Sequence, residues 1–187
     1  MTMFRRFMLI LIYLMKSWSR PLNPMRILGI DPGLRVCGYG LIENSSGVLK
    51  VLEAGVITTN PKQTLQQRLD EIYRSLAELI TESKPDVMIL EKLYAHHRHP
   101  ATAFLLGHAR GVICLLCAQY KLGLVEYLPT RIKKAIVGNG HAGKLQIKNM
   151  IERLLNIKGG NYLFDVTDAL ALAVAHAYIA ALDKRKR

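Results

Sequence analysis

Acidic residues are scarce in this chain, and none occurs before Asp31. The 187 residues include 14 aspartates and glutamates against 26 lysines and arginines, which gives a formal net charge of +12. Part of the positive charge lies at the two ends, and within the body of the chain it is concentrated in residues 121–158. Such a surface suits a polyanion such as nucleic acid or an anionic membrane, although a solvated basic face without a partner has the same composition.

Cysteines are also few. The chain has three, Cys37, Cys114 and Cys117, so at least one is unpaired, which excludes a fully disulfide-bonded scaffold. Cys114 and Cys117 lie in an apolar helical run, and we expect two buried thiols there rather than a metal or redox CxxC site. This usage is typical of a reduced intracellular protein, and we expect a cytoplasmic location.

The N-terminal 24 residues lack both acid and a long apolar run. The run at residues 7–15 is shorter than the roughly 20 residues that a membrane-spanning helix needs. It also lacks a good signal-peptide cleavage site, so we expect no membrane partner. We interpret residues 1–24 as an extension outside the fold, produced by a start codon assigned upstream of Met25 or serving as a leader. One domain at residues 25–182 and a basic tail at 183–187 follow.

The body of the chain alternates short apolar segments with helical patterns. Residues 26–31, 36–42 and 48–58 are separated by tight turns, which predicts three strands in an antiparallel meander. A helical pattern at 62–82 then leads to a buried strand at 87–90, which implies a parallel crossover. The remaining predicted elements are helix, strand and three helices, at 101–120, 124–127, 129–137, 144–156 and 164–182.

Four carboxylates stand at the ends of these elements. Asp31 ends the first predicted strand and Glu91 ends the fourth, while Asp165 and Asp168 share one face of the first turn of the last helix. Each has a purely structural alternative: Asp31 can open an Asp-Pro-Gly turn, and aspartates at a helix N-terminus can cap free N–H groups.

The order of elements predicts an α/β fold of the ribonuclease H-like class. We expect a five-stranded mixed sheet, antiparallel over three strands and then parallel, with helices on both faces. In that arrangement the four carboxylates converge. Because they would repel one another, they call for hard divalent cations such as Mg²⁺ or Mn²⁺. Two such ions can activate a water and stabilise the leaving oxygen of a phosphodiester.

Several motifs together resemble the RuvC family of Holliday-junction resolvases. They are individually modest but specific in combination and order, and they span about residues 25–180. In chain order they are Gly29-Ile-Asp-Pro-Gly33, Gly38-Tyr-Gly40, Leu90-Glu91, Gly107-His-Ala-Arg-Gly111, Val137-Gly138 and Asp165-x-x-Asp168-Ala-Leu-Ala. The resemblance implies a homodimeric, Mg²⁺-dependent endonuclease with two ions in each site. Such an enzyme nicks four-way DNA junctions symmetrically in recombination and repair, beside a branch-migration complex of the RuvA and RuvB type.

The resemblance also implies site residues. The four family carboxylates match Asp31, Glu91, Asp165 and Asp168 as catalytic metal ligands. The family's crossover wedge matches Tyr94, a tyrosine in place of phenylalanine, and the two lysines near the scissile phosphate match Lys133 and Lys144. Arg98, in the same polar loop as Tyr94, is a further candidate for DNA contact.

Other interpretations of the same residues stay open. The four carboxylates do not exclude an RNA-processing nuclease of the same fold, and a non-cleaving protein that binds branched DNA would share the basic surface. An actin-like ATPase would need a second half that the chain lacks. The segment from Gly138 to Lys144 fits GxxxxGK but has leucine at the next position, and His96, His97 and His99 lack further zinc ligands at the usual spacing. Arg110 lies on an apolar helix and needs a partner, which we expect to be an ion pair or a dimer face.

Overall fold

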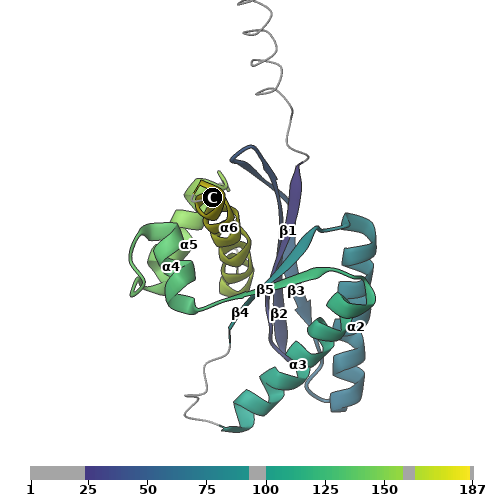
Figure 1. Cartoon of the computed structure of the whole chain (residues 1–187). Helices are drawn as coiled ribbons and strands as arrows, with labels where there is room; N and C mark the ends of the chain where they lie inside the picture. The colour runs from purple at the N-terminus through teal and green to yellow at the C-terminus, as the bar shows by residue number, and fades with distance from the viewer. Residues whose placement is uncertain (1–23, 93–99, 158–162, 186–187) are drawn as a thin grey trace, which may run out of the picture.

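The computed structural model describes residues 24–92, 100–157 and 163–185, which form a five-stranded sheet flanked by helices (Figure 1). The strand order is β3-β2-β1-β4-β5. The strands are β1 (Met25–Asp31), β2 (Val36–Ser45), β3 (Val48–Thr58), β4 (Val87–Glu91) and β5 (Gly123–Tyr127). The described helices are α2 (Leu65–Ser83), α3 (Pro100–Gln119), α4 (Pro129–Val137), α5 (Lys144–Leu154) and α6 (Phe164–Arg185).

The strand directions agree with the sequence prediction. β1 pairs antiparallel with β2, and β2 pairs antiparallel with β3, through short turns that leave no room for a crossover. β4 then returns parallel to β1, and β5 lies parallel to β4. The predicted five-stranded mixed sheet with helices on both faces is therefore confirmed. The carboxyl ends of β1, β4 and β5 meet at one edge of the sheet as a result.

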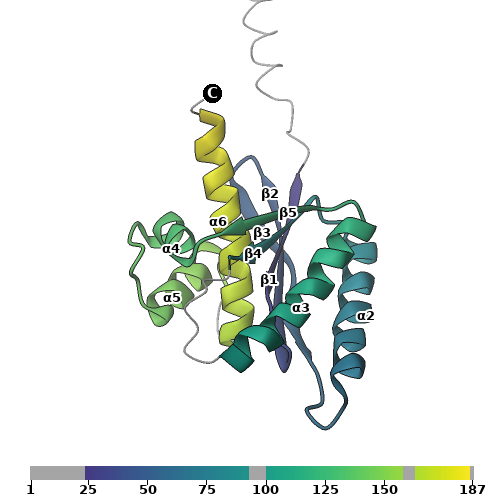
Figure 2. The same cartoon turned by 60° about the horizontal axis from the view of Figure 1, so that its bottom comes forward.

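Alternate side chains of β1 and β4 point into two separate apolar cores, because successive residues of a strand face opposite sides of the sheet. Ile27 and Ile89 pack on the face covered by α4, α5 and α6. Leu28 and Met88 pack on the other face, which α2 and α3 cover. The two helical layers can be followed on either side of the sheet in Figures 1 and 2. The central strands are thus fixed from both sides.

Helix α6 lies in direct backbone contact with β1 and β2 because three strand positions are glycine. A Cβ atom at Gly29 would lie 2.0 Å from the carbonyl oxygen of Ala169, and one at Gly38 would lie 2.2 Å from that of Asp165. At Gly40 the same atom would lie 2.7 Å from Leu170 Cδ2. No side chain larger than hydrogen fits at these positions without a shift of the helix. The glycines therefore set how closely the first two turns of α6 approach the sheet.

Helix α6 is also long and largely apolar. Its segment Phe164–Asp183 is long and apolar enough to cross a membrane by length and composition, but 67% of its most apolar window is buried inside the protein. It therefore serves here as a core helix. It continues to Arg185, beyond the end expected near residue 182.

One prediction about the helices is wrong. Cys114 is exposed on α3, whereas Cys117 is buried as expected. The run around them is apolar on all sides, so composition alone could not show that one face of α3 lacks a covering element in the described part of the chain. Phe104 and Leu115 on the same helix are exposed as well, by 71% and 53%.

Candidate active site

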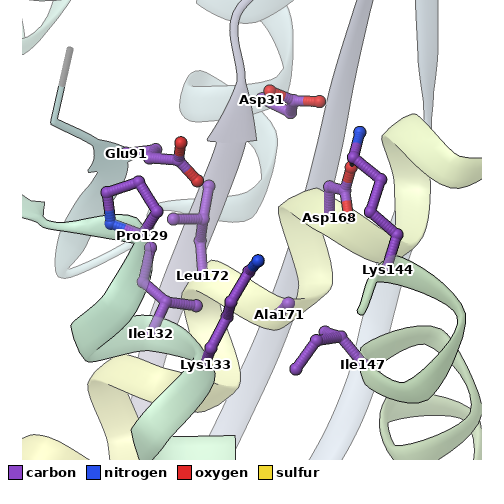
Figure 3. Close-up of a pocket in the computed structure, with 10 residues that line it drawn as sticks. All are labelled: Asp31, Glu91, Pro129, Ile132, Lys133, Lys144, Ile147, Asp168, Ala171 and Leu172. Atoms are coloured by element: carbon purple, nitrogen blue, oxygen red, sulfur yellow. Dashed lines mark ion pairs between the residues drawn. The ribbon is translucent and has the colours of Figure 1, made fainter. Parts of the chain in front are cut away.

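Three of the four predicted carboxylates line one pocket at the carboxyl edge of the parallel strands (Figure 3). Asp31 and Glu91 are the last residues of β1 and β4, which pair in register up to Ile30 and Leu90. The two carboxylates are therefore delivered side by side by strand pairing. Asp168 enters from the first turns of α6, whose position the strand glycines determine. The pocket has a volume of about 240 Å³.

The opposite wall of the pocket carries two lysines from two further helices. Lys133 comes from the middle of α4 and Lys144 is the first residue of α5. The ammonium of Lys144 lies 3.6 Å from the Asp168 carboxylate, and Figure 3 shows both lysine side chains directed towards the carboxylates. Lys144 is 75% exposed, so this pair contributes little to folding stability. The lysines instead make the pocket a site of mixed charge.

Asp31 is the electrostatic centre of the pocket. Its pKa is raised from 3.8 to about 7, first by burial and then by the negative charges of Asp168, Asp165 and Glu91, while the charge of Lys144 opposes the shift. The pKa values of Glu91 and Asp168 are raised as well, first by partial burial. Lys133 and Lys144 oppose the shift at both of these residues. The cluster therefore carries more negative charge than its two lysines neutralise.

Asp165 belongs to the same electrostatic cluster but does not line the pocket. It is half-buried at the start of α6, and its main chain rests against Gly38 of β2. Its charge acts on Asp31, as the raised pKa of Asp31 shows. The structure thus places Asp168 in the pocket and Asp165 beside it, a difference that their common helical face does not reveal.

The donor set of the pocket fits a hard divalent cation. The acidic side chains of the pocket are carboxylates, the ligand type that Mg²⁺ prefers. They repel the charge of Asp31, and a bound cation would relieve this repulsion. As the side chains lie, the described residues contain no preformed group of three or more histidine, cysteine, aspartate or glutamate side chains able to hold a metal ion. Lys144 occupies part of the space at Asp168. Cation binding would therefore require the carboxylate side chains to change conformation.

Several predicted residues lie outside the described part of the chain. These are the wedge candidate Tyr94, the DNA-contact candidate Arg98 and the three histidines at 96, 97 and 99. Their roles stay predictions. Lys133 and Lys144, the other two predicted DNA contacts, do line the pocket with the carboxylates.

Sequence reasoning missed the apolar floor of the pocket, which is formed by Pro129, Ile132, Ile147, Ala171 and Leu172. The helical periodicity of α4 and α5 could have revealed this floor. Ile132 directly precedes Lys133, and Ile147 lies within one helical turn of Lys144. The partner predicted for Arg110 is found: its guanidinium forms an ion pair with Glu126 of β5.

The chain matches known proteins over nearly the whole described domain. Residues 27–176 match the family model described as crossover junction endodeoxyribonuclease RuvC. The protein of that description from Rhodopirellula baltica is 43% identical over 162 residues, which cover 87% of this chain and 91% of the relative. The one from Alkaliphilus metalliredigens is 44% identical over 154 residues, covering 82% and 93%.

Solved structures agree with this assignment. The structure of T. thermophilus RuvC in complex with Holliday junction substrate superposes with a TM-score of 0.80 at 26% identity, over 85% of this chain and 96% of the other. The yeast mitochondrial Holliday junction resolvase shares the fold, with a TM-score of 0.67 at 16% identity, over 93% and 87%. Sequence, fold and pocket agree, and the chain belongs to the RuvC family of crossover junction endodeoxyribonucleases.

Proposed function

We propose that this protein resolves four-way DNA junctions by hydrolysing phosphodiester bonds at the pocket of Asp31, Glu91 and Asp168. One observation carries the proposal: β1, β4, α4, α5 and α6 each deliver a charged side chain to the same small pocket. Carboxylates beside lysines suit a phosphodiester, because the carboxylates can hold cations while the lysines contact phosphate oxygens. The related T. thermophilus RuvC was solved with a Holliday junction substrate, which supports DNA junctions as the substrate class.

Each charged residue has a proposed role. Asp31, Glu91, Asp165 and Asp168 would hold two Mg²⁺ ions, with Mn²⁺ as a substitute. Bound there, the ions would activate a water and would stabilise negative charge at the leaving oxygen. Asp31 contributes most through its position between the other carboxylates, whose charges all act on it. Asp165 contributes from beside the pocket.

Lys133 and Lys144 would bind the phosphate next to the scissile bond. Lys144 pairs with Asp168 at 3.6 Å, and the charge of Lys133 acts on Glu91 and Asp168. A phosphate bound in the pocket offers both ammonium groups a stronger partner, which frees Asp168 for a cation. Such contacts depend on salt, because lysines that neutralise phosphates release counterions. Tyr94 and Arg98 would contact the junction from the segment that follows Glu91.

The exposed face of α3 supports the proposal of a homodimer. Its members recur at helical spacing and are all uncharged or histidine: Phe104, Gly107, His108, Gly111, Cys114, Leu115 and Ala118. We name this surface the α3 stripe. A Cβ atom at Gly107 or Gly111 would meet nothing within 4 Å, so both glycines leave open space between the larger side chains. A second copy of the helix could approach closely there and bury the stripe, which gives one pocket per subunit for paired nicks.

Cys114 makes the dimer testable because it lies within the α3 stripe while Cys37 and Cys117 are buried. Mild oxidation should cross-link two copies through Cys114, and Cys114→Ser should abolish the cross-link. Leu115→Glu should shift the protein to a monomer in sedimentation, whereas Val48→Glu, at a residue of β3 that is 71% exposed, should not. A monomer at micromolar concentration for the unmodified chain would refute the dimer.

We place the nuclease domain at residues 25–182, with residues 1–24 and 183–187 outside it, and the protein in the cytoplasm beside a branch-migration complex of the RuvA and RuvB type. The test of function is a cleavage assay on a four-way DNA junction, linear duplex DNA and structured RNA, each with Mg²⁺ and with EDTA. Symmetric nicks in the junction alone, only with Mg²⁺, are expected. Cleavage of RNA would overturn the substrate, and binding without cleavage would overturn the enzyme.

A further inference from the structure

We propose that Arg110 is a positioning residue that fixes the direction of Glu91 at the end of β4. The inference rests on the proposed function, in which Glu91 is a metal ligand. Arg110 lies on α3, outside the pocket, and its guanidinium contacts none of the charged side chains that line the pocket. Its contacts are with the main chain of Glu91 and with the side chain of Glu126.

The peptide group that joins Glu91 to Lys92 is held at both of its polar ends. Its carbonyl oxygen, that of Glu91, accepts a hydrogen bond of 2.6 Å from Nη1 of Arg110. Its N–H group, that of Lys92, donates a hydrogen bond of 2.8 Å to the carbonyl oxygen of Tyr127. Two bonds on opposite sides fix the plane of this peptide. The orientation of that plane sets the direction in which the Glu91 side chain leaves the strand.

This fixation matters because the pairing of β4 with β1 stops at Leu90, and at Glu91 only the pairing with Tyr127 of β5 continues. Asp31 on the neighbouring strand pairs with Gly38 of β2, which α6 contacts directly, whereas Glu91 is more exposed. Without Arg110 the last peptide of β4 would keep only its bond to Tyr127. The carboxylate would then sample more directions, and fewer of them would face Asp31 and Asp168.

Glu126 has the supporting role of holding the guanidinium in place. Nη2 of Arg110 pairs with the Glu126 carboxylate, and the Arg110 side chain is only 10% exposed. A guanidinium is planar and presents several N–H groups in a fixed fork, so one arginine can bond to a carboxylate and to a carbonyl oxygen at once. Lysine at this position could serve one acceptor well but not both. Arginine is therefore required by the geometry rather than by its charge alone.

The test compares Arg110→Met with a matched control, Arg26→Met. Arg26 makes the same two kinds of contact at the opposite end of the parallel strands: it donates to the carbonyl oxygen of Ser83 at 2.6 Å and pairs with Glu43 at 3.8 Å. Two Mg²⁺ concentrations are measured for each variant. The first gives half of the full rise in Tm in the absence of DNA, and the second gives half-maximal junction cleavage.

We expect Arg110→Met to raise the Mg²⁺ concentration needed in both measurements, by about 10- to 100-fold, the usual effect of removing a group that orients a metal ligand. Arg26→Met should change it by less than about twofold, the scatter expected for a residue with no contact to the ligands. Affinity for the junction in EDTA should stay unchanged in both. Equal effects of the two variants, or an unchanged Mg²⁺ requirement in a folded Arg110→Met protein, would overturn the proposal.

The double variant Arg110→Glu with Glu126→Arg separates positioning from folding. It preserves an ion pair between α3 and β5 but removes the donor from α3 that reaches the Glu91 carbonyl oxygen. We expect it to regain the Tm of the unmodified protein while its Mg²⁺ requirement stays raised; recovery of both would show a merely structural role. If Arg110→Met does not fold, Arg110→Lys is measured instead, and a Mg²⁺ requirement like that of the unmodified chain would equally overturn the proposal. Failure of the unmodified protein to cleave junctions would refute the proposed function, while the Tm measurement would still judge Arg110.

Discussion

Replacing Asp31 with asparagine should stabilise the metal-free protein at neutral and alkaline pH. The change keeps the shape of the side chain and removes the charge on which Asp168, Asp165 and Glu91 all act. The difference between the ordinary pKa of 3.8 and the value of about 7 in the fold corresponds to about 4 kcal/mol. Because Asp31 keeps part of its surface in solvent, which screens these charges, we expect about half of that, roughly 2 kcal/mol.

The sign of the effect follows from proton binding. Between pH 3.8 and about 7 the folded protein holds a proton on Asp31 that the unfolded chain has released, so the stability of the unmodified protein falls as the pH rises through this window. Asparagine cannot ionise and escapes the loss. The advantage of the variant should therefore be negligible near pH 4, grow up to about pH 7 and stay constant above it.

The measurement is thermal unfolding in EDTA at a series of pH values. At pH 8 the Tm of Asp31→Asn should exceed that of the unmodified chain by about 4–8 °C, as expected for a protein of this size. Asp70→Asn, at an exposed ion pair with Arg74, is the control and should shift the Tm little. Mg²⁺ should raise the Tm of the unmodified protein more than that of the variant. A variant no more stable than the unmodified chain at pH 8 would refute the assignment of Asp31 as the crowded centre of the pocket.

Gly38, Lys144 and the buried Tyr127–His176 pair allow three further tests. Gly38→Ala places a Cβ atom 2.2 Å from a main-chain oxygen of α6, so it should lower the free energy of unfolding by about 1–3 kcal/mol and abolish cleavage. Gly123→Ala meets only ordinary contacts and should change neither quantity in unfolding and cleavage assays. Lys144→Gln should slow cleavage and weaken the salt dependence of junction binding while changing stability by less than about 1 kcal/mol; an unchanged salt slope would count against a phosphate contact. Tyr127→Phe removes the hydroxyl that bonds Nδ1 of buried His176 at 2.8 Å, and urea unfolding should show a loss of about 1–3 kcal/mol; a neutral result would mean that water replaces the hydroxyl.

The raised pKa values also indicate that the proposed cation would stabilise the fold in addition to its proposed role in hydrolysis. The pocket gathers charge that the chain alone does not neutralise, and the two lysines compensate only part of it. Folding therefore tolerates a local cost at the site that a bound cation would remove. Sites of this kind are typical places where stability and activity oppose each other.

The sequence by itself determined the order and direction of the elements. Tight turns allowed only antiparallel pairing of β1, β2 and β3, and the helix between β3 and β4 required a parallel return. These two local facts place Asp31 beside Glu91, because the carboxyl ends of neighbouring parallel strands meet at one edge. The glycines at 29, 38 and 40 were visible in the sequence as motif residues, but their use, a close approach of α6, was not.

Tertiary structure decided which side chains share the pocket. Lys133 and Lys144 could be expected there only from the family resemblance. The sequences of α4 and α5 do not determine where these lysines lie relative to the carboxylates, because that depends on how the two helices pack on α6. Packing likewise separated Asp168 from Asp165, exposed Cys114 and brought Arg110 to the end of β4. Periodicity reports which face of a helix is apolar, but what lies opposite that face depends on contacts between residues far apart in the chain, and those contacts exist only in the folded protein.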